Sequence, residues 1–185
     1  MGDSNRITRL QTERLFLRAF ELGDAGDVQR LVGDPEVALM TANIPHPYPD
    51  GAAEEWIAGH AAQFEAGELA PFAITLCAEG ALIGSISLDI DQRHARAELG
   101  YWIGKPWWNH GYCTEAAQAV LHYGFDVLGL NRIHAWHFRR NPASGRVMLK
   151  IGMRHEGCLP QHVRRDGRFE DLESYGMLKR DHKPS

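Results

Sequence analysis

Residues 95–116 read ARAELGYWIGKPWWNHGYCTEA and contain two sequence patterns in succession. Residues 95–104 alternate with the period of two that is typical of a β-strand. From Thr114, apolar residues recur with the period of an amphipathic helix, and Gly129 follows as a residue suited to end that helix. The loop between the two patterns contains Gly111. This stretch therefore predicts a strand, a tight turn and a helix in direct succession.

The loop at Gly111 precedes the N-terminus of the predicted helix. Backbone N–H groups and the helix dipole attract anions at such a position, and His110 would add positive charge when protonated. A loop of this kind is more often a plain connector, in which Gly111 would only supply a positive φ angle. The loop alone leaves both interpretations open.

A second strand and helix follow the first pair. Residues 132–138, RIHAWHF, predict a strand, and residues 141–152 predict a helix with Asn141 as N-cap and Pro142 in its first turn. In a β-α-β-α unit both helices begin at the same edge of the sheet, beyond the strand C-termini. We therefore expect Asn141 and Ser144 to face the same cleft as the Gly111 loop.

The remaining segments predict strands and helices in a single series with no linker. Strands are expected at residues 14–20, at two segments within 71–90 that turn at Glu79-Gly80, and at 155–163 and 169–178, which the hairpin signal RRDG joins. One helix is expected to begin at Gly23. A second helix is expected over residues 53–67, after a proline-rich loop at 44–51. A meander of strands plus a β-α-β-α unit predicts an α+β fold with a mixed sheet.

The composition excludes several classes of protein. The 185 residues carry a formal net charge of −4, so a basic face for nucleic acid is not expected. No apolar run approaches the ~20 residues of a membrane helix. Residues 1–10 lack the apolar core of a signal peptide, and Arg6 breaks the myristoylation pattern. We therefore expect a cytoplasmic protein.

Cysteine and histidine spacing does not predict a metal site. Cys77, Cys113 and Cys158 are far apart with no CxxC motif, which is typical of reduced thiols. His134 and His137 are three positions apart on a predicted strand, so they point to opposite faces. We expect no bound metal.

Glu98 lies in the middle of the predicted strand at residues 95–104, on the face that also carries Arg96 and Trp102. Glutamate is unfavourable within a strand. Apolar surroundings would raise its pKa and allow it to accept a proton near neutrality. The alternative is a surface carboxylate paired with Arg96 or another neighbour, and the sequence does not decide between the two.

Several motifs, in this order, resemble the Gcn5-related N-acetyltransferase (GNAT) superfamily, and within it the ribosomal-protein N-terminal acetyltransferase branch. They are TERLFLRAF, ELGYWIGKPWWNHGYCTEA, GLNRIHAW, NPASGRVMLKIGMRHEG and RRDGRFEDLESYGML. The resemblance spans roughly residues 10–180. It implies one bacterial acetyltransferase domain over residues 1–185, a mostly antiparallel sheet with two splayed central strands that admit acetyl-CoA, and a homodimer.

The resemblance also implies where acetyl-CoA binds. The loop at residues 108–113 corresponds to the family's pyrophosphate loop, although only Gly111 matches the usual pattern of Gln or Arg, two residues, Gly, one residue, and Gly or Ala. The cofactor-binding residues that the resemblance implies are Tyr101, Trp102, Ile103, Trp108, Asn109, His110, Gly111, Tyr112, Cys113, Thr114, Asn141 and Ser144.

The family's usual general acid is a tyrosine seven residues after the Asn that corresponds to Asn141, and this chain has Met148 at that place. In the branch that it resembles, a serine three residues after that Asn is the replacement, which is Ser144. The implied reaction is direct attack of a primary amine on the thioester, with Glu98 as base and Ser144 as acid.

The acceptor is expected to be a protein N-terminal α-amine. Tyr48, Trp107 and Asp171 are the expected acceptor contacts, with Glu170 and Glu173 adding negative charge. Two alternatives remain open at this point: a small amine such as an amino acid, polyamine or aminoglycoside, and a CoA-binding sensor without turnover. Met148 and Cys113 keep the sensor open as an alternative, and Glu98, at a position where it can act as a base, counts against it.

Overall fold

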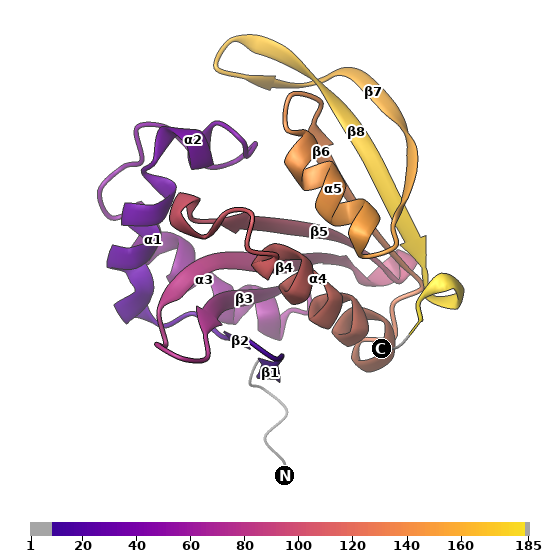
Figure 1. Ribbon diagram of the computed structural model, residues 1–185, viewed down its shortest axis with the longest axis horizontal. Coiled ribbons are helices and arrows are strands. Elements are labelled where there is room, and N and C mark those ends of the chain that lie inside the picture. Colours follow the sequence, from indigo (N-terminus) through magenta and orange to yellow (C-terminus); the bar gives the residue numbers. More distant parts are fainter. Residues whose placement is uncertain (1–8, 184–185) are drawn as a thin grey trace.

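The computed structural model describes residues 9–183; residues 1–8, to which the predicted lack of a signal peptide or myristoylation refers, lie outside it. Eight strands form one sheet in the order β1-β2-β3-β4-β5-β6-β8-β7 (Figure 1). The strands are β1 Leu10–Gln11, β2 Leu15–Arg18, β3 Leu69–Leu76, β4 Leu82–Asp91, β5 Arg96–Ile103, β6 Arg132–Phe138, β7 Arg154–Arg165 and β8 Arg168–Leu178. The helices are α1 Ala25–Val32, α2 Pro35–Ala38, α3 Ala52–Glu65, α4 Tyr112–His122 and α5 Pro142–Lys150.

β5 and β6 form the parallel pair in an otherwise antiparallel sheet. Their register covers three positions, from Arg96 opposite Arg132 to Glu98 opposite His134. Beyond Glu98 the pairing ends, although β5 continues to Ile103 and β6 to Phe138. The predicted mixed sheet with splayed central strands is therefore confirmed, and Glu98 lies where the splay begins.

Helices cover both faces of the sheet (Figure 1). The larger core joins α4 and α5 to one face, and it includes Phe72, Val120 and Met148, each at most 1% exposed. A smaller core joins α1 and α3 to the other face through Val28 and Ile57. Burial of these apolar stripes is the main force that holds the layers together.

Several boundaries differ from the sequence expectation. The helix expected from Thr114 begins at Tyr112 and ends in a π-helical turn, Tyr123–Val127, with Leu128 N–H donating to the Tyr123 carbonyl oxygen at 3.0 Å. Periodicity did not reveal this turn because a single π turn shifts the pattern by only one residue. The RRDG hairpin is confirmed: Asp166 and Gly167 have φ angles of 48° and 81°, as a tight hairpin turn requires.

His60 on α3 is a buried imidazole, 5% exposed, whose ring centroid lies 4.4 Å from that of Trp56 and 5.4 Å from that of Phe20. Within residues 9–183, neither ring nitrogen has a hydrogen-bond partner. Burial lowers the pKa of His60 to about 4, so the ring is neutral in the folded protein at neutral pH.

We expect His60 to make the protein acid-sensitive. Below an unfolded pKa near 6.5 the unfolded chain binds a proton that folded His60 excludes, so the free energy of unfolding falls as pH drops toward about 4. The expected loss is about 2 kcal/mol between pH 7.5 and pH 5. Urea unfolding of the wild type and of His60→Leu at both pH values measures this loss. The other groups titrate in both proteins, so the difference between them isolates His60. A stability difference between the two that is independent of pH would contradict this assignment.

Candidate active site

Beyond Glu98, β5 presents backbone groups to the gap between β5 and β6. Gly104 N–H donates to the Ile83 carbonyl oxygen at 2.8 Å, on the β4 side. Because backbone direction alternates along a strand, the N–H and C=O groups of Trp102 also face β4, and those of Tyr101 and Ile103 face the gap toward β6. Of the three residues expected to hold pantetheine through their backbone, Trp102 is therefore committed to the sheet.

The loop after β5 is held against the strand. Trp108 Nε1 donates to the Ile103 carbonyl oxygen at 2.6 Å, and His110 Nδ1 lies 2.8 Å from the Trp108 carbonyl oxygen. Asn109 and Gly111 adopt positive φ angles of 65° and 81°. Gly111 is the N-cap of α4, so the loop turns directly into the helix and directs its first N–H groups outward.

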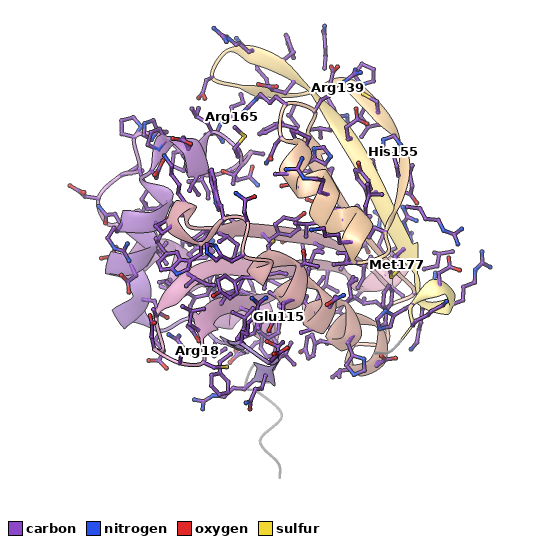
Figure 2. All side chains as sticks on the ribbon, viewed as in Figure 1. Arg18, Glu115, Arg139, His155, Arg165 and Met177 are labelled. Carbon is purple, nitrogen blue, oxygen red and sulfur yellow. The ribbon has the colours of Figure 1, made fainter. Side chains whose placement is uncertain are left out.

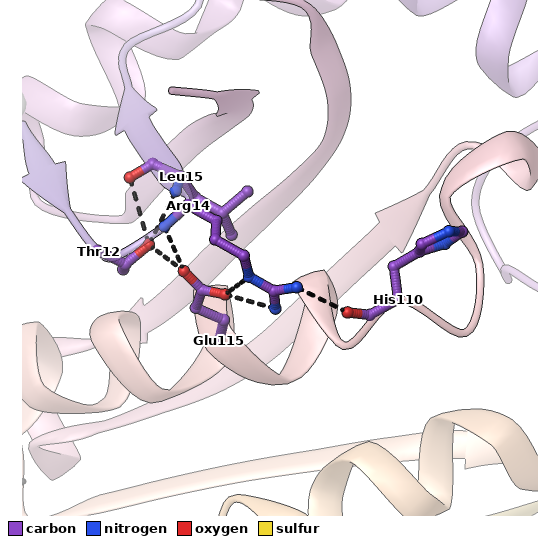
Figure 3. A network of polar contacts seen from close by, with 5 residues as sticks. All are labelled: Thr12, Arg14, Leu15, His110 and Glu115. Atoms are coloured by element: carbon purple, nitrogen blue, oxygen red, sulfur yellow. Dashed lines mark hydrogen bonds and ion pairs between the residues drawn. The ribbon is translucent and has the colours of Figure 1, made fainter. Parts of the chain in front are cut away.

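Arg14, which is distant in sequence, fixes this loop together with Glu115 of α4 (Figure 3). Arg14 Nε donates to Glu115 Oε2 at 2.7 Å, and Arg14 Nη1 donates to the His110 carbonyl oxygen at 3.1 Å. Thr12 Oγ1 donates to Glu115 Oε1 at 2.6 Å, and the Arg14 guanidinium lies 4.6 Å from the centre of the Tyr112 ring. Sequence reasoning missed this network because the turn between β1 and β2, which carries Thr12 and Arg14, is far from α4 along the chain.

The N-terminus of α5 lies beside β5. Tyr101 OH donates to the Ser144 carbonyl oxygen at 3.0 Å, and Asn141 Nδ2 donates to Ser144 Oγ at 3.2 Å. Asn141 occupies the N-cap position as predicted, but its side chain makes no capping bond to the helix. The structure therefore brings Tyr101, Asn141 and Ser144 together, whereas Met148 is 1% exposed and belongs to the core.

Cys113 and Thr114 lie in the first turn of α4, partly buried below the loop. Burial raises the pKa of the Cys113 thiol to about 12. The thiol is therefore protonated at neutral pH and is a poor nucleophile. Its bulk is accommodated against the core, which leaves the backbone of the loop free for a ligand.

Glu98 projects from the opposite face of β5 from Tyr101, since alternate residues of a strand point to opposite faces. Its carboxylate lies 3.6 Å from His134 Nε2 and is 37% exposed. Arg96, the other partner considered, pairs instead with Asp91 at 3.1 Å. The surroundings of Glu98 are thus polar and open to solvent, not apolar.

An open pocket of about 790 Å³ adjoins Glu98. Its charged lining consists of Glu68, Asp89, Asp91, Arg96, Glu98 and His134. Asp89 stands opposite Glu98 in the β4–β5 register. Desolvation within the pocket, and secondarily the charge of Glu98, raise the pKa of the Asp89 carboxyl. Because Arg96 neutralises Asp91, the remaining carboxylates give the pocket negative character.

The expected acceptor residues have different surroundings. Trp107 packs on the larger core, and Tyr48 packs against the α1–α3 core. Asp171 Oδ1 accepts from Gln161 N–H at 2.9 Å, and Asp171 Oδ2 lies 3.6 Å from Arg139. The neighbouring carboxylates Glu170 and Glu173 are likewise ion-paired, with Arg140 and His155. The attraction for a cation that was expected at Asp171 is therefore largely neutralised within the hairpin, and the acidic surface lies at Glu98 instead.

The β7–β8 hairpin reaches across to the segment after α2 (Figure 2). Arg165, 8% exposed, donates from Nη1 to the Thr41 carbonyl oxygen and from Nη2 to the Ile44 carbonyl oxygen, the latter at 2.7 Å. Asn141 Nδ2 also donates to the Met40 carbonyl oxygen at 3.4 Å. Residues 40–44 therefore connect the tip of the hairpin with the N-terminus of α5.

Within residues 9–183, no helix combines the length and the apolar character that crossing a bilayer requires.

Comparison with known proteins agrees with this geometry. The family model for the acetyltransferase (GNAT) domain matches residues 14–154. An uncharacterized N-acetyltransferase, p20, of Bacillus licheniformis is 34% identical over 175 residues, which cover 94% of this chain and 97% of p20. The ribosomal-protein-serine acetyltransferase of Escherichia coli is 32% identical over 101 residues, covering 54% of this chain and 56% of that protein.

A solved structure has the same fold. The GNAT-family acetyltransferase from Bacillus anthracis superposes with a TM-score of 0.79 and 31% identity, over 94% of this chain and 99% of that one. The splayed strands β5 and β6 and the loop before α4 lie inside the range that the family model matches. The chain therefore belongs to the Gcn5-related N-acetyltransferase (GNAT) family of acetyltransferases.

Proposed function

We propose that this acetyltransferase modifies the α-amine of a protein N-terminus. The open acidic pocket beside Glu98 carries this proposal. The end of a polypeptide can enter an open pocket, whereas an enzyme for a small amine is expected to have a closed one. The negative charge of the pocket would attract the protonated amine. The similarity to a ribosomal-protein-serine acetyltransferase supports a protein acceptor.

Acetyl-CoA, the family's acetyl donor, would occupy the splay between β5 and β6. The α4 N-terminus and the loop at residues 108–111 would hold its pyrophosphate through backbone N–H groups. The Tyr101 carbonyl oxygen, which faces the gap, would hold the pantetheine arm together with Asn141, because the Ile103 carbonyl oxygen already accepts from Trp108 Nε1. Trp108 replaces the Gln or Arg of the usual pattern, so the pyrophosphate would be bound by the backbone N–H groups of the loop. Arg14 fixes the conformation of that backbone by donating to the His110 carbonyl oxygen.

Arg14→Ala is expected to raise KM for acetyl-CoA by about 10-fold with little change in kcat, because the loop loses its hydrogen bond and its link to Glu115. Arg30→Ala is the matched control, since it also removes an arginine from an ion pair, with Asp27 on α1. Steady-state kinetics with varied acetyl-CoA measures both variants. Equal KM values for the two variants would contradict a role for Arg14 in loop geometry.

The chain's residues fit a direct transfer. Glu98 would take the proton of the attacking amine, through water where the distance requires it. The N–H groups of Tyr101 and Ile103 would stabilise the charge that develops on the thioester oxygen. Ser144 Oγ accepts a bond from Asn141, so its own proton would be free to pass to the leaving thiolate, and a proton would return to the Ser144 oxygen from solvent.

The energetics of deprotonation favour an α-amine. At pH 7, deprotonating an α-amine of pKa ~8 costs about 1.4 kcal/mol, whereas a lysine amine of pKa ~10.4 costs about 4.6 kcal/mol. Glu98 is a solvent-accessible carboxylate, and Ser144 is a weak acid. Such a site suits the acceptor that is easier to deprotonate.

Thiol release from acetyl-CoA tests the acceptor. The panel comprises peptides with free N-termini, the same peptides N-acetylated, polyamines, aminoglycosides and free amino acids. Turnover with free peptides, lost on N-acetylation, is the expected result. Turnover confined to the small amines would overturn the N-terminal proposal. Binding of acetyl-CoA without turnover on any acceptor would favour the sensor.

We also propose that the chain acts as a single cytoplasmic domain that forms a homodimer. Sedimentation equilibrium measures the proposed dimerisation directly. A monomer at micromolar concentration would contradict it.

A further inference from the structure

Three side chains with metal-binding atoms meet at the end of α4 that is remote from the acetyl-CoA loop. His122 Nδ1 lies 2.8 Å from Asp126 Oδ2, and His182 Nε2 lies 3.8 Å from the same oxygen. All three ligand atoms lie within 4.8 Å of one another. The ring centroids of His122 and His182 are 6.2 Å apart, so the segment that follows β8 lies beside this end of α4.

The fold brings the three together by two local features. The π-helical turn Tyr123–Val127 continues α4 and carries Asp126 on the same side as His122. After β8, the chain folds back in a short 3₁₀ turn, Lys179–Asp181, which is anchored by Lys179 N–H donating to the Asn131 carbonyl oxygen at 2.9 Å. His182 follows that turn, and its ring packs on Phe125 with centroids 5.1 Å apart.

His182 has an unsatisfied nitrogen that points to the cluster. Its side chain is 12% exposed, and Nε2 is shielded from solvent without a hydrogen-bond partner in the described part of the chain. Leaving a buried polar atom unpaired is unfavourable.

We propose that His122, Asp126 and His182 bind one divalent transition-metal ion of the zinc class. Two imidazole nitrogens and a carboxylate oxygen are ligands that zinc accepts, with a solvent position completing a tetrahedron. Bonds of about 2.0–2.1 Å place tetrahedral ligand atoms about 3.4 Å apart. The observed separations of 2.8 and 3.8 Å from Asp126 bracket that value.

The ion would tie the C-terminal segment to α4. His122 and Asp126, with side chains 59% and 41% exposed, form the open side of the site, and His182 forms its buried side. Periodicity did not suggest this site, because the third ligand comes from another element. The expectation of no bound metal rested on the spacing of the cysteines and on His134 and His137, which do point to opposite faces.

The test uses tag-free, full-length protein stripped of metal and titrated with ZnCl₂ at neutral pH. Calorimetry is expected to show one high-affinity ion per chain, and Zn²⁺ at about 100 times Kd is expected to raise Tm by roughly 5–10 °C. His122→Gln removes an exposed ligand and is expected to fold normally while losing both effects. His162→Gln, at an exposed histidine of the β7–β8 hairpin, is the control and is expected to retain them.

Two results would overturn the site. One is a wild-type protein whose Tm does not respond to Zn²⁺. The other is a Zn²⁺ response that persists in His122→Gln and in Asp126→Asn, since the ion would then be bound elsewhere.

Discussion

Glu98→Gln is expected to lower kcat for a peptide acceptor by about 10²- to 10³-fold at pH 7, with KM for acetyl-CoA unchanged. Glutamine keeps the size and polarity of the side chain but cannot take a proton. Glu98 lies at the last paired position of β5, where the strand separates from β6. Its carboxylate faces the acidic pocket, so a bound amine would be within its reach, directly or through water.

The pH profile distinguishes a base from a structural residue. Between pH 7 and pH 9 the neutral fraction of an α-amine of pKa ~8 rises about 10-fold without help, so the deficit of Glu98→Gln is expected to shrink by about that factor. Loss of folding or of acceptor binding would not be recovered in this way. Initial rates at saturating acetyl-CoA between pH 6.5 and 9 measure the recovery.

Asp89→Asn is the matched control for Glu98. It removes a carboxylate from the same pocket, directly opposite Glu98 in the register. We expect it to raise KM for the acceptor and to change kcat by less than about 10-fold, because it contributes charge and not proton transfer. Equal losses of kcat in both variants would contradict Glu98 as the base.

Gly84→Ala is expected to lower the free energy of unfolding by about 3 kcal/mol, at the upper end of the usual cost of overpacking. A Cβ atom at Gly84 would lie 2.4 Å from the Trp102 carbonyl oxygen and 3.1 Å from Ile103 Cα. Both atoms belong to the backbone of β5. They cannot move aside unless β4 and β5 separate, next to the segment that would hold pantetheine.

Gly100→Ala provides the comparison for Gly84→Ala. Gly100 is also a strand glycine in the same pair of strands, but a Cβ there would meet Ser87 Oγ at 3.6 Å, which is an ordinary contact. We expect Gly100→Ala to change stability by less than about 1 kcal/mol. Urea unfolding measures both variants. Similar free energies for the two would show that β4 and β5 can shift apart at low cost.

Local chemistry made much of the fold predictable. Alternation marks β5, and a change of period marks α4, because each pattern reflects one face of one element. Gly111 and Asp166-Gly167 stand where positive φ angles are needed, and Pro142 begins α5. These are properties of a few neighbouring residues, so a sequence reveals them without knowledge of the rest of the chain.

The electrostatics of the site were less predictable. Glu98 was expected either in apolar surroundings or as a surface carboxylate paired with Arg96 or another neighbour, and the sequence did not show that this neighbour is His134. Asp171 was expected to attract an acceptor, but Arg139 and Gln161 engage it. A charge pattern along one strand does not show which charges the neighbouring strands will neutralise.

The sequence by itself determined the order of elements, the strand–loop–helix segment at Gly111 and the resemblance to GNAT acetyltransferases. Only the tertiary structure decided which side chains meet: Arg14 with the loop before α4, Tyr101 with Ser144, and His182 with His122. The reason is physical. Periodicity and turn chemistry act over a few residues, whereas these contacts depend on strand register and on how helices pack across the sheet.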